Sequence, residues 1–117
     1  MSNGQAFETA AAGLLSDAGL QVLERNFSCK LGEIDLVCAD AGQLVFVEVR
    51  RRSNPRYGSA TSSVSASKQR KLIRTAQFFL QRRAQYRGAS CRFDVVAFDT
   101  PPGGRERVQW IKNAFTM

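Results

Sequence analysis

Residues 33–50 read EIDLVCADAGQLVFVEVR, and this stretch decides the fold. Two runs rich in β-branched and aromatic residues, 33–38 and 44–50, flank the short polar segment 39–43. A glycine in a short polar loop between two such runs is typical of a β-hairpin. The stretch therefore predicts two antiparallel strands joined by a tight turn.

The predicted hairpin brings two carboxylates together. If the turn is centred on residues 41–42, Asp35 lies opposite Glu48. Glu33 then lies opposite Arg50, unless a bulge in the turn shifts this register. Carboxylates that face each other across a ladder lie about 5 Å apart and repel unless positive charge lies between them. Two explanations stay open: a solvated face screened by Arg50, or a site for a hard divalent cation such as Mg²⁺.

The rest of the chain supplies helices on both sides of this hairpin and further strands after it. Apolar residues at helical spacing predict helices over 5–18 and 67–87, each followed by a glycine. Weak alternation over 20–28 and apolar runs over 92–98 and 108–112 predict three more strands, and the Ser-rich segment 53–66 predicts a loop. The pattern indicates one α/β or α+β domain over residues 1–117 with both helices covering a sheet.

The net charge of +7 hides a strong asymmetry. Residues 1–49 hold two basic and seven acidic side chains, whereas residues 50–117 hold 15 basic and three acidic ones. Between Val49 and Phe93 there are 12 Lys or Arg and no carboxylate. Thirteen of the 17 cations are Arg, whose planar fork matches phosphate. The block predicts a polyanionic partner, and a merely solvated basic surface is the alternative.

Two residue types restrict the chemistry. The chain has no histidine, which excludes Ser-His-Asp and Cys-His catalysis and histidine-bound metals. Its three cysteines, Cys29, Cys38 and Cys91, have no C-x-x-C spacing and indicate neither a disulfide framework nor a redox pair. The sequence shows no signal-peptide pattern and no apolar run of about 20 residues, so we expect a cytoplasmic protein without membrane contact.

Several motifs carry a resemblance to a known family. Asp35 followed by Glu48-Val49-Arg50 is similar to the D…(D/E)-x-K signature of the restriction-endonuclease-like nucleases. More specifically, the chain resembles the YraN family, small bacterial proteins related to archaeal Holliday-junction resolvases. The motifs that carry this resemblance are GEIDLV (32–37), VFVEVRRR (45–52), RFDVV (92–96) and NAF (113–115).

The resemblance implies a restriction-endonuclease-like core, a central mixed β-sheet flanked by helices, with a metal-dependent nuclease site. It implies that Asp35 and Glu48 are ligands of Mg²⁺ or Mn²⁺, with the Val49 carbonyl as a further donor. Glu8 would approach from the first helix and position a water or a second ion. Glu33 is expected to be an outer partner of Arg50.

The chain departs from the signature at Arg50, where the nucleases have lysine. Arginine is always protonated, so Arg50 can neutralise charge in a transition state but cannot accept a proton. Lys68, in the first turn of the second predicted helix, is a candidate substitute, and an ordinary exposed lysine is the alternative. The basic residues expected to contact nucleic acid are Arg51, Arg52, Arg56, Arg70, Lys71 and Arg74, with Tyr57 stacking on a base.

Three functions remain open from the sequence. The first is a DNA endonuclease acting on branched or single-stranded structures, with DNA rather than RNA as the expected substrate. The second is a weakly active or inactive module of the same fold that binds nucleic acid. The third is a protein-interaction adaptor with an apolar patch formed by Trp110, Phe115 and Met117. Related resolvases work as dimers, so a homodimer is expected by analogy alone.

Overall fold

The predicted hairpin lies at the centre of the fold. In the structure, a computed structural model that describes residues 3–52, 62–100 and 103–117, strands β2 (Gly32–Asp40) and β3 (Gln43–Arg52) flank a two-residue turn. Ala41 and Gly42 in this turn have φ of 51° and 88°, as a type I′ turn requires. The ladder runs from Asp40–Gln43 to Leu36–Val47, which confirms the predicted register over this part of the hairpin.

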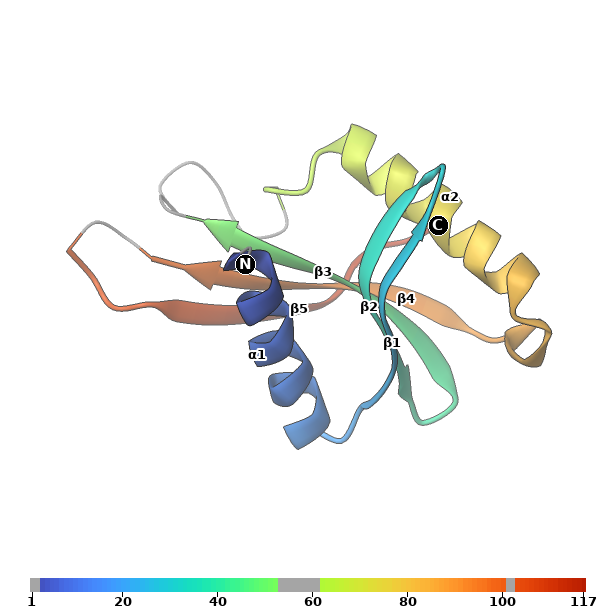
Figure 1. Ribbon diagram of the computed structural model, residues 1–117, viewed down its shortest axis with the longest axis horizontal. Coiled ribbons are helices and arrows are strands. Elements are labelled where there is room, and N and C mark those ends of the chain that lie inside the picture. Colours follow the sequence, from blue (N-terminus) through green and yellow to red (C-terminus); the bar gives the residue numbers. More distant parts are fainter. Residues whose placement is uncertain (1–2, 53–61, 101–102) are drawn as a thin grey trace.

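The chain forms a mixed sheet of five strands in the order β1-β2-β3-β4-β5 (Figure 1). The β3–β4 pair is parallel and the others are antiparallel, because helix α2 carries the chain from β3 back to the start of β4. The α/β architecture is therefore as predicted. The remaining elements are α1 (Asn3–Asp17), β1 (Gln21–Cys29), α2 (Ala66–Arg82), the short 3-10 helix η2 (Ala84–Tyr86), β4 (Cys91–Asp99) and β5 (Arg107–Phe115).

The second helix is shorter than the sequence predicted. It ends at Arg82, and Arg83 leaves the helical conformation with φ −120° and ψ 85°. The guanidinium of Arg83 turns to Glu24 on β1, 2.8 Å away, and packs over the rings of Phe27 and Phe79. This tertiary contact ends the helix before Gly88, where the apolar pattern had placed its end.

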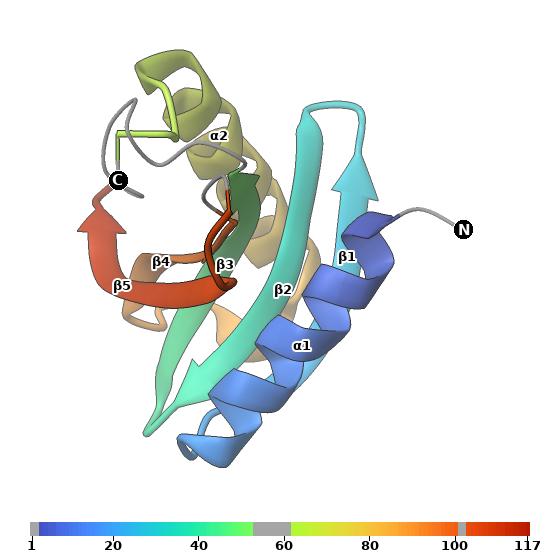
Figure 2. The same cartoon turned by 90° about the vertical axis from the view of Figure 1, so that its left-hand side faces the viewer.

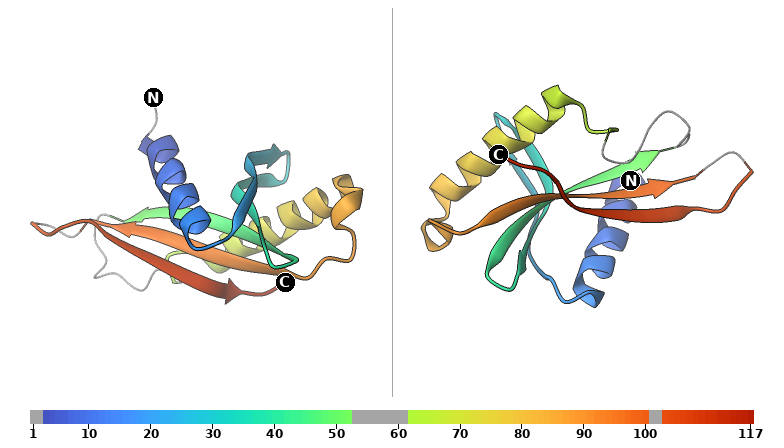
Figure 3. Two further views of the ribbon diagram at one scale, coloured as in Figure 1. Left: turned by 90° about the horizontal axis from the view of Figure 1, so that it is seen from below. Right: turned by 180° about the vertical axis from the view of Figure 1, so that it is seen from behind.

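The two helices cover opposite faces of the sheet, α1 in front of β2 and α2 behind it (Figures 2 and 3). Under α2, the core contains Ile34, Phe46 and Phe79; under α1, it contains Leu15, Leu36 and Val47. None of the helices in the described part of the chain has the length and hydropathy to cross a membrane. Burial of both sheet faces is the main stabilising contribution to this architecture.

A buried carboxylate fixes the last strand to the sheet. Asp94 on β4 is fully buried and accepts hydrogen bonds from Arg92, from Trp110 Nε1 (2.9 Å) and from the backbone N–H of Asn113 (2.9 Å). Asn113 has a φ of 52° and lies where the β4–β5 register shifts. Asp94 therefore satisfies the backbone at this bulge and holds β5 in one register.

The apolar patch predicted at the C-terminus does not form as expected. The Trp110 indole is bound to Asp94, and the Phe115 ring stacks on Phe93 with centroids 4.8 Å apart. Of the three residues only Met117, with 54% exposure, is an exposed large hydrophobic side chain. The adaptor hypothesis therefore loses two of its three supporting residues.

The approach of α2 to the β1–β2 hairpin gives a test of the packing. A Cβ on Gly32 would lie 2.8 Å from Thr75 Oγ1, and Gly32 has a φ of 155°. We expect Gly32→Ala to lower the free energy of unfolding by about 1–3 kcal/mol, measured by urea denaturation. Gly13→Ala, in an exposed part of α1 with open space around the new Cβ, is the control and should be neutral or slightly stabilising. Equal stability of Gly32→Ala and the wild type would contradict this packing.

Candidate metal centre and its basic surroundings

The site begins where β2 and β3 separate. Their ladder ends at the Leu36–Val47 pair, whereas β3 continues to pair with β4 up to Arg52. Beyond the ladder, the N–H of Val49 donates to Asp35 Oδ2 at 2.8 Å. A side-chain carboxylate thus satisfies a backbone donor that has lost its strand partner, and Asp35 is held in the opening between the strands.

Strand β2 also changes face at Asp35. Ile34 packs in the cluster under α2 and Leu36 in the cluster under α1, although residues two apart in a regular strand share a face. On the neighbouring strand, Asn26 has a φ of 56° and lies between the pairs Arg25–Leu36 and Phe27–Ile34. The strand irregularity opens this part of the sheet toward α1.

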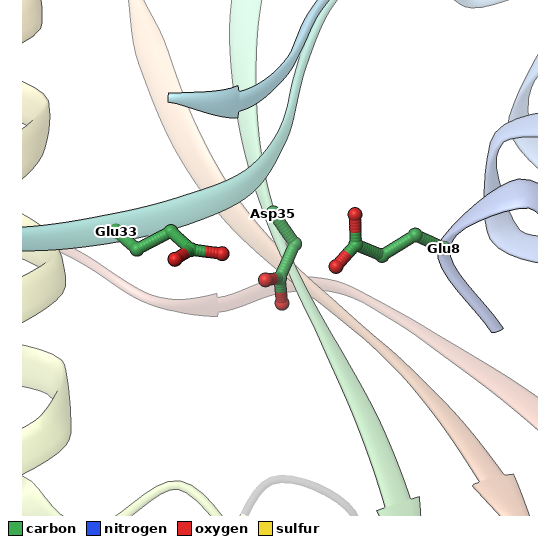
Figure 4. A group of neighbouring side chains, drawn as sticks. All are labelled: Glu8, Glu33 and Asp35. Carbon is green, nitrogen blue, oxygen red and sulfur yellow. The ribbon is translucent and has the colours of Figure 1, made fainter. Parts of the chain in front are cut away.

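Three carboxylates converge at this opening. Glu8 comes from α1, Glu33 and Asp35 come from β2, and one oxygen of each lies within 4.8 Å of the others. Figure 4 shows Asp35 between Glu33 and Glu8. Glu8 and Asp35 also line a pocket of about 280 Å³ together with Val49 and Arg51. The arrangement offers several hard oxygen ligands from two different elements, and this group could hold a metal ion.

Burial and neighbouring carboxylates dominate the electrostatics of the group. Burial and the nearby Glu48 raise the pKa of Asp35 to about 7. Burial and the charge of Asp35 raise the pKa of Glu8 as well, against a lowering hydrogen bond from Asn26. Glu8 Oε1 is buried and has no hydrogen-bond partner among the described residues. An unpartnered buried oxygen beside repelling carboxylates fits a divalent cation, which would satisfy both.

Glu48 is a further carboxylate near Asp35 and already has cationic partners. It is only 5% exposed, and its charge is one of the causes that raise the pKa of Asp35. Its Oε2 is 3.5 Å from Arg50 Nη1 and 3.7 Å from Lys68 Nζ. The structure therefore brings Glu48, Arg50 and Lys68 together as one ionic cluster that adjoins the carboxylate group.

Arg50 also connects β3 to the start of α2. Its Nη2 donates to the carbonyl of Ser63 at 2.9 Å. The next residue, Val64, is buried in the core, and Ser65 caps the helix by accepting from the N–H of Lys68. These contacts fix the first turn of α2 against the site and place Lys68 at Glu48.

One expected pairing needs correction, and one residue expected to contact nucleic acid is engaged in an ion pair. Glu33 is not the partner of Arg50, because the ladder ends before their register positions and Arg50 pairs with Glu48 instead. Arg52, expected to contact nucleic acid, is bound to Asp99 through two hydrogen bonds of 2.7 and 2.8 Å, and its side chain is only 11% exposed. Its guanidinium is occupied by a structural ion pair.

The other predicted site residues that the structure describes lie in two regions, the carboxylate pocket and helix α2. Arg51 is exposed at the carboxylate pocket, with its guanidinium over the Phe7 ring. Arg70, Lys71 and Arg74 are exposed on α2. Val49 lines the pocket and its N–H donates to Asp35, whereas the role expected for its carbonyl stays a prediction. Arg56 and Tyr57 lie outside the described residues.

Glu33 is the member of the carboxylate group that the sequence reasoning placed elsewhere. The signal for it was present, since Glu33 and Asp35 are two residues apart on one strand. Continuing the β2–β3 ladder beyond Leu36 would instead place Glu33 opposite Arg50, and the sequence prediction followed that register. The β2–β3 ladder ends at Leu36, so Glu33 lies beside Asp35 and not opposite Arg50. No local sequence pattern shows where the ladder ends.

These features define an α/β protein with a five-stranded mixed sheet, two helices and a carboxylate group that could hold a metal ion. The chain belongs to the family described as "Uncharacterised protein family UPF0102", whose model matches residues 7–98. This confirms the YraN-like resemblance seen in the sequence motifs.

Relatives match over almost the whole chain. A UPF0102 protein of Stutzerimonas stutzeri (strain A1501) is 50% identical over 114 residues, which cover 97% of this chain and 94% of the relative. One of Pseudomonas putida (strain F1) is 47% identical over 112 residues, covering 96% and 91%. One of Janthinobacterium sp. (strain Marseille) is 50% identical over 111 residues, covering 95% and 85%. The chain is thus similar in extent to these family members.

The raised pKa of Asp35 predicts a pH-dependent stability of the metal-free protein. A carboxyl group with a higher pKa in the folded state favours folding at low pH and loses that contribution as pH rises from about 4 through about 7. In EDTA, we expect the free energy of unfolding to be lower at pH 8 than at pH 5 by at least about 1 kcal/mol. Asp35→Asn keeps an acceptor for Val49 and should flatten this profile. An unchanged profile in Asp35→Asn would contradict the assignment.

Truncation to alanine should affect stability strongly at Arg52 and only weakly at its neighbour Arg51. Arg52→Ala leaves Asp99 buried without its main partner and should lower the free energy of unfolding by about 2–4 kcal/mol. Arg51→Ala removes an exposed side chain and should change stability by less than about 0.5 kcal/mol. Thermal and urea unfolding of the two variants measure this difference. Equal destabilisation would refute the separate roles.

Proposed function

We propose that this protein is a metal-dependent phosphodiesterase of the restriction-endonuclease-like class that acts on nucleic acid, with DNA as its substrate. The observation that carries the proposal is the group of Glu8, Glu33 and Asp35, in which burial and neighbouring carboxylates raise the pKa of Glu8 and of Asp35, and which adjoins the basic half of the chain. Phosphodiester hydrolysis needs both features, a cation held by oxygen ligands and positive side chains that bind phosphate.

The topology supports the same proposal. The carboxylates lie at the hairpin β2–β3, and the chain returns through α2 to a strand parallel to β3. A central mixed sheet with a helix on each face agrees with the architecture that the D…(D/E)-x-K resemblance implies. The signature residues Asp35 and Glu48 adjoin each other beside this hairpin.

The chain's own residues divide the work between them. Glu8, Glu33 and Asp35 would hold Mg²⁺ or Mn²⁺, which when bound supplies Lewis-acid chemistry to a phosphate oxygen. Arg51, exposed at the mouth of the pocket, binds the phosphate that enters it. Arg50 and Lys68 stay paired with Glu48 and present positive charge to the same phosphodiester. Glu48 keeps both cations in place.

A second function is favoured by the ionic cluster at Glu48. Its carboxylate is already balanced by Arg50 and Lys68, so the signature position carries less free negative charge than a carboxylate pair alone. A protein that binds nucleic acid without cleaving it would keep this cluster as a phosphate-binding surface. Metal-independent binding would then remain when Asp35 or Glu48 is replaced.

A cleavage assay distinguishes the two functions. Linear, flapped and four-way DNA and matched RNA are incubated with the protein in Mg²⁺ or Mn²⁺ and in EDTA. We expect metal-dependent cleavage of DNA that Asp35→Asn and Glu33→Gln reduce by about 100-fold or more, because each removes a charged ligand. Glu106→Gln, a change at an exposed carboxylate on another part of the surface, is the matched control.

The same cleavage assay also tests the effect of arginine in place of the signature lysine at position 50. Faster cleavage by Arg50→Lys would show that arginine at this position limits the rate. Absence of cleavage of all substrates in both metals, with DNA binding intact in Asp35→Asn, would overturn the enzymatic proposal in favour of the binding module.

A further inference from the structure

Helix α2 carries a phenylalanine that the core does not use. Phe79 is fully buried beneath the helix, whereas its neighbour Phe78 is partly exposed and belongs to neither buried cluster of the described residues. The Arg82 guanidinium lies over the Phe78 ring at 4.8 Å, and the Phe27 ring lies 6.3 Å from it. Phe78 is therefore an aromatic ring held at the surface by an arginine on one side and β1 on another.

Phe78 lies in a row of cations. Lys71, Arg74, Phe78 and Arg82 follow each other at spacings of three and four residues, which places them on one flank of the helix. We call these four residues the α2 flank. Its three cations are exposed, and no carboxylate occurs in the sequence between Val49 and Phe93. Glu24 of β1, the carboxylate next to this end of α2, is bound to Arg83 at 2.8 Å.

We infer that the α2 flank binds single-stranded nucleic acid, with phosphates on Lys71, Arg74 and Arg82 and an unpaired base stacked on Phe78. Cations alone would serve a duplex as well, because a duplex presents only phosphates to such a surface. A partly exposed ring such as that of Phe78 adds contact only with a base that has left its stack, which favours the single strand. Arginine beside the ring supplies a second planar group for the same base.

The position and length of the flank agree with this occupant. Lys71 and Arg82 are 11 residues apart, which corresponds to about 16 Å along a helix and suits a short segment of a few nucleotides. Lys68, one turn before Lys71, contacts Glu48 beside the carboxylate group. A strand on the flank therefore leads toward the candidate metal centre. The inference rests on the proposed action on nucleic acid, and it specifies the single strand as the form bound.

The decisive experiment compares two probes with equal charge, oligo-dT and an abasic strand of the same length. Binding of the full chain to each is measured by fluorescence anisotropy in EDTA at several salt concentrations. We expect tighter binding of oligo-dT than of the abasic strand, and Phe78→Leu should weaken oligo-dT binding by about fivefold or more without changing abasic binding. Phe78→Trp should retain or increase the preference for oligo-dT and guards against an effect of misfolding.

Further variants distinguish the contacts to phosphates from the contact to a base. The double variant Lys71→Gln/Arg74→Gln should weaken the binding of both probes and reduce the slope of log K against log salt concentration by about 1.4. Arg105→Gln, which changes an exposed cation outside α2, is the control and should have a smaller effect on the preference for oligo-dT and on this slope. Equal binding of the two probes by the wild type, or tighter binding of a duplex of the same length, would overturn the inference. Because this assay contains no metal, it tests binding separately from cleavage. Base-dependent binding here, together with no cleavage in the assay with Mg²⁺ or Mn²⁺, would contradict only the proposed enzymatic function.

Discussion

The hydrogen bond from the N–H of Val49 to Asp35 Oδ2 is the contact on which the site depends. Strand β3 has to stay with β4 while β2 turns away with β1, so a backbone donor at the point of separation needs a new acceptor. A carboxylate supplies it and is thereby fixed between the strands with burial that raises its pKa. The opening of the sheet and the placement of the acidic group are two results of one backbone requirement.

Most of the fold could be predicted from local patterns. Period-two alternation with a glycine turn located the central hairpin and its register, and helical spacing located both helices. The end of α2 could not be located in this way. Arg83 leaves the helix for an ion pair with Glu24, 59 residues earlier in the chain, and such a contact overrides local helix propensity.

The site was harder to predict than the fold, because it lies where regular structure stops. Continuing the ladder past Leu36 assigned Glu33 to Arg50, and the face change at Asp35 has no signature in a single sequence. Arg51 and Arg52 are adjacent residues of the same type and cannot be distinguished from the sequence. In the structure, Asp99 on β4 forms an ion pair with Arg52, whereas Arg51 is exposed. Distant partners decided these roles, and only the structure identifies them.

The Asp94 network has a consequence for the behaviour of this protein at high concentration. β5 is an edge strand, and the unpaired backbone of an edge can recruit a second chain. The bulge at Asn113, which Asp94 holds through its backbone N–H, interrupts the regular row of donors and acceptors along that edge. A carboxylate buried inside the sheet thus acts at its rim as protection against edge-to-edge aggregation.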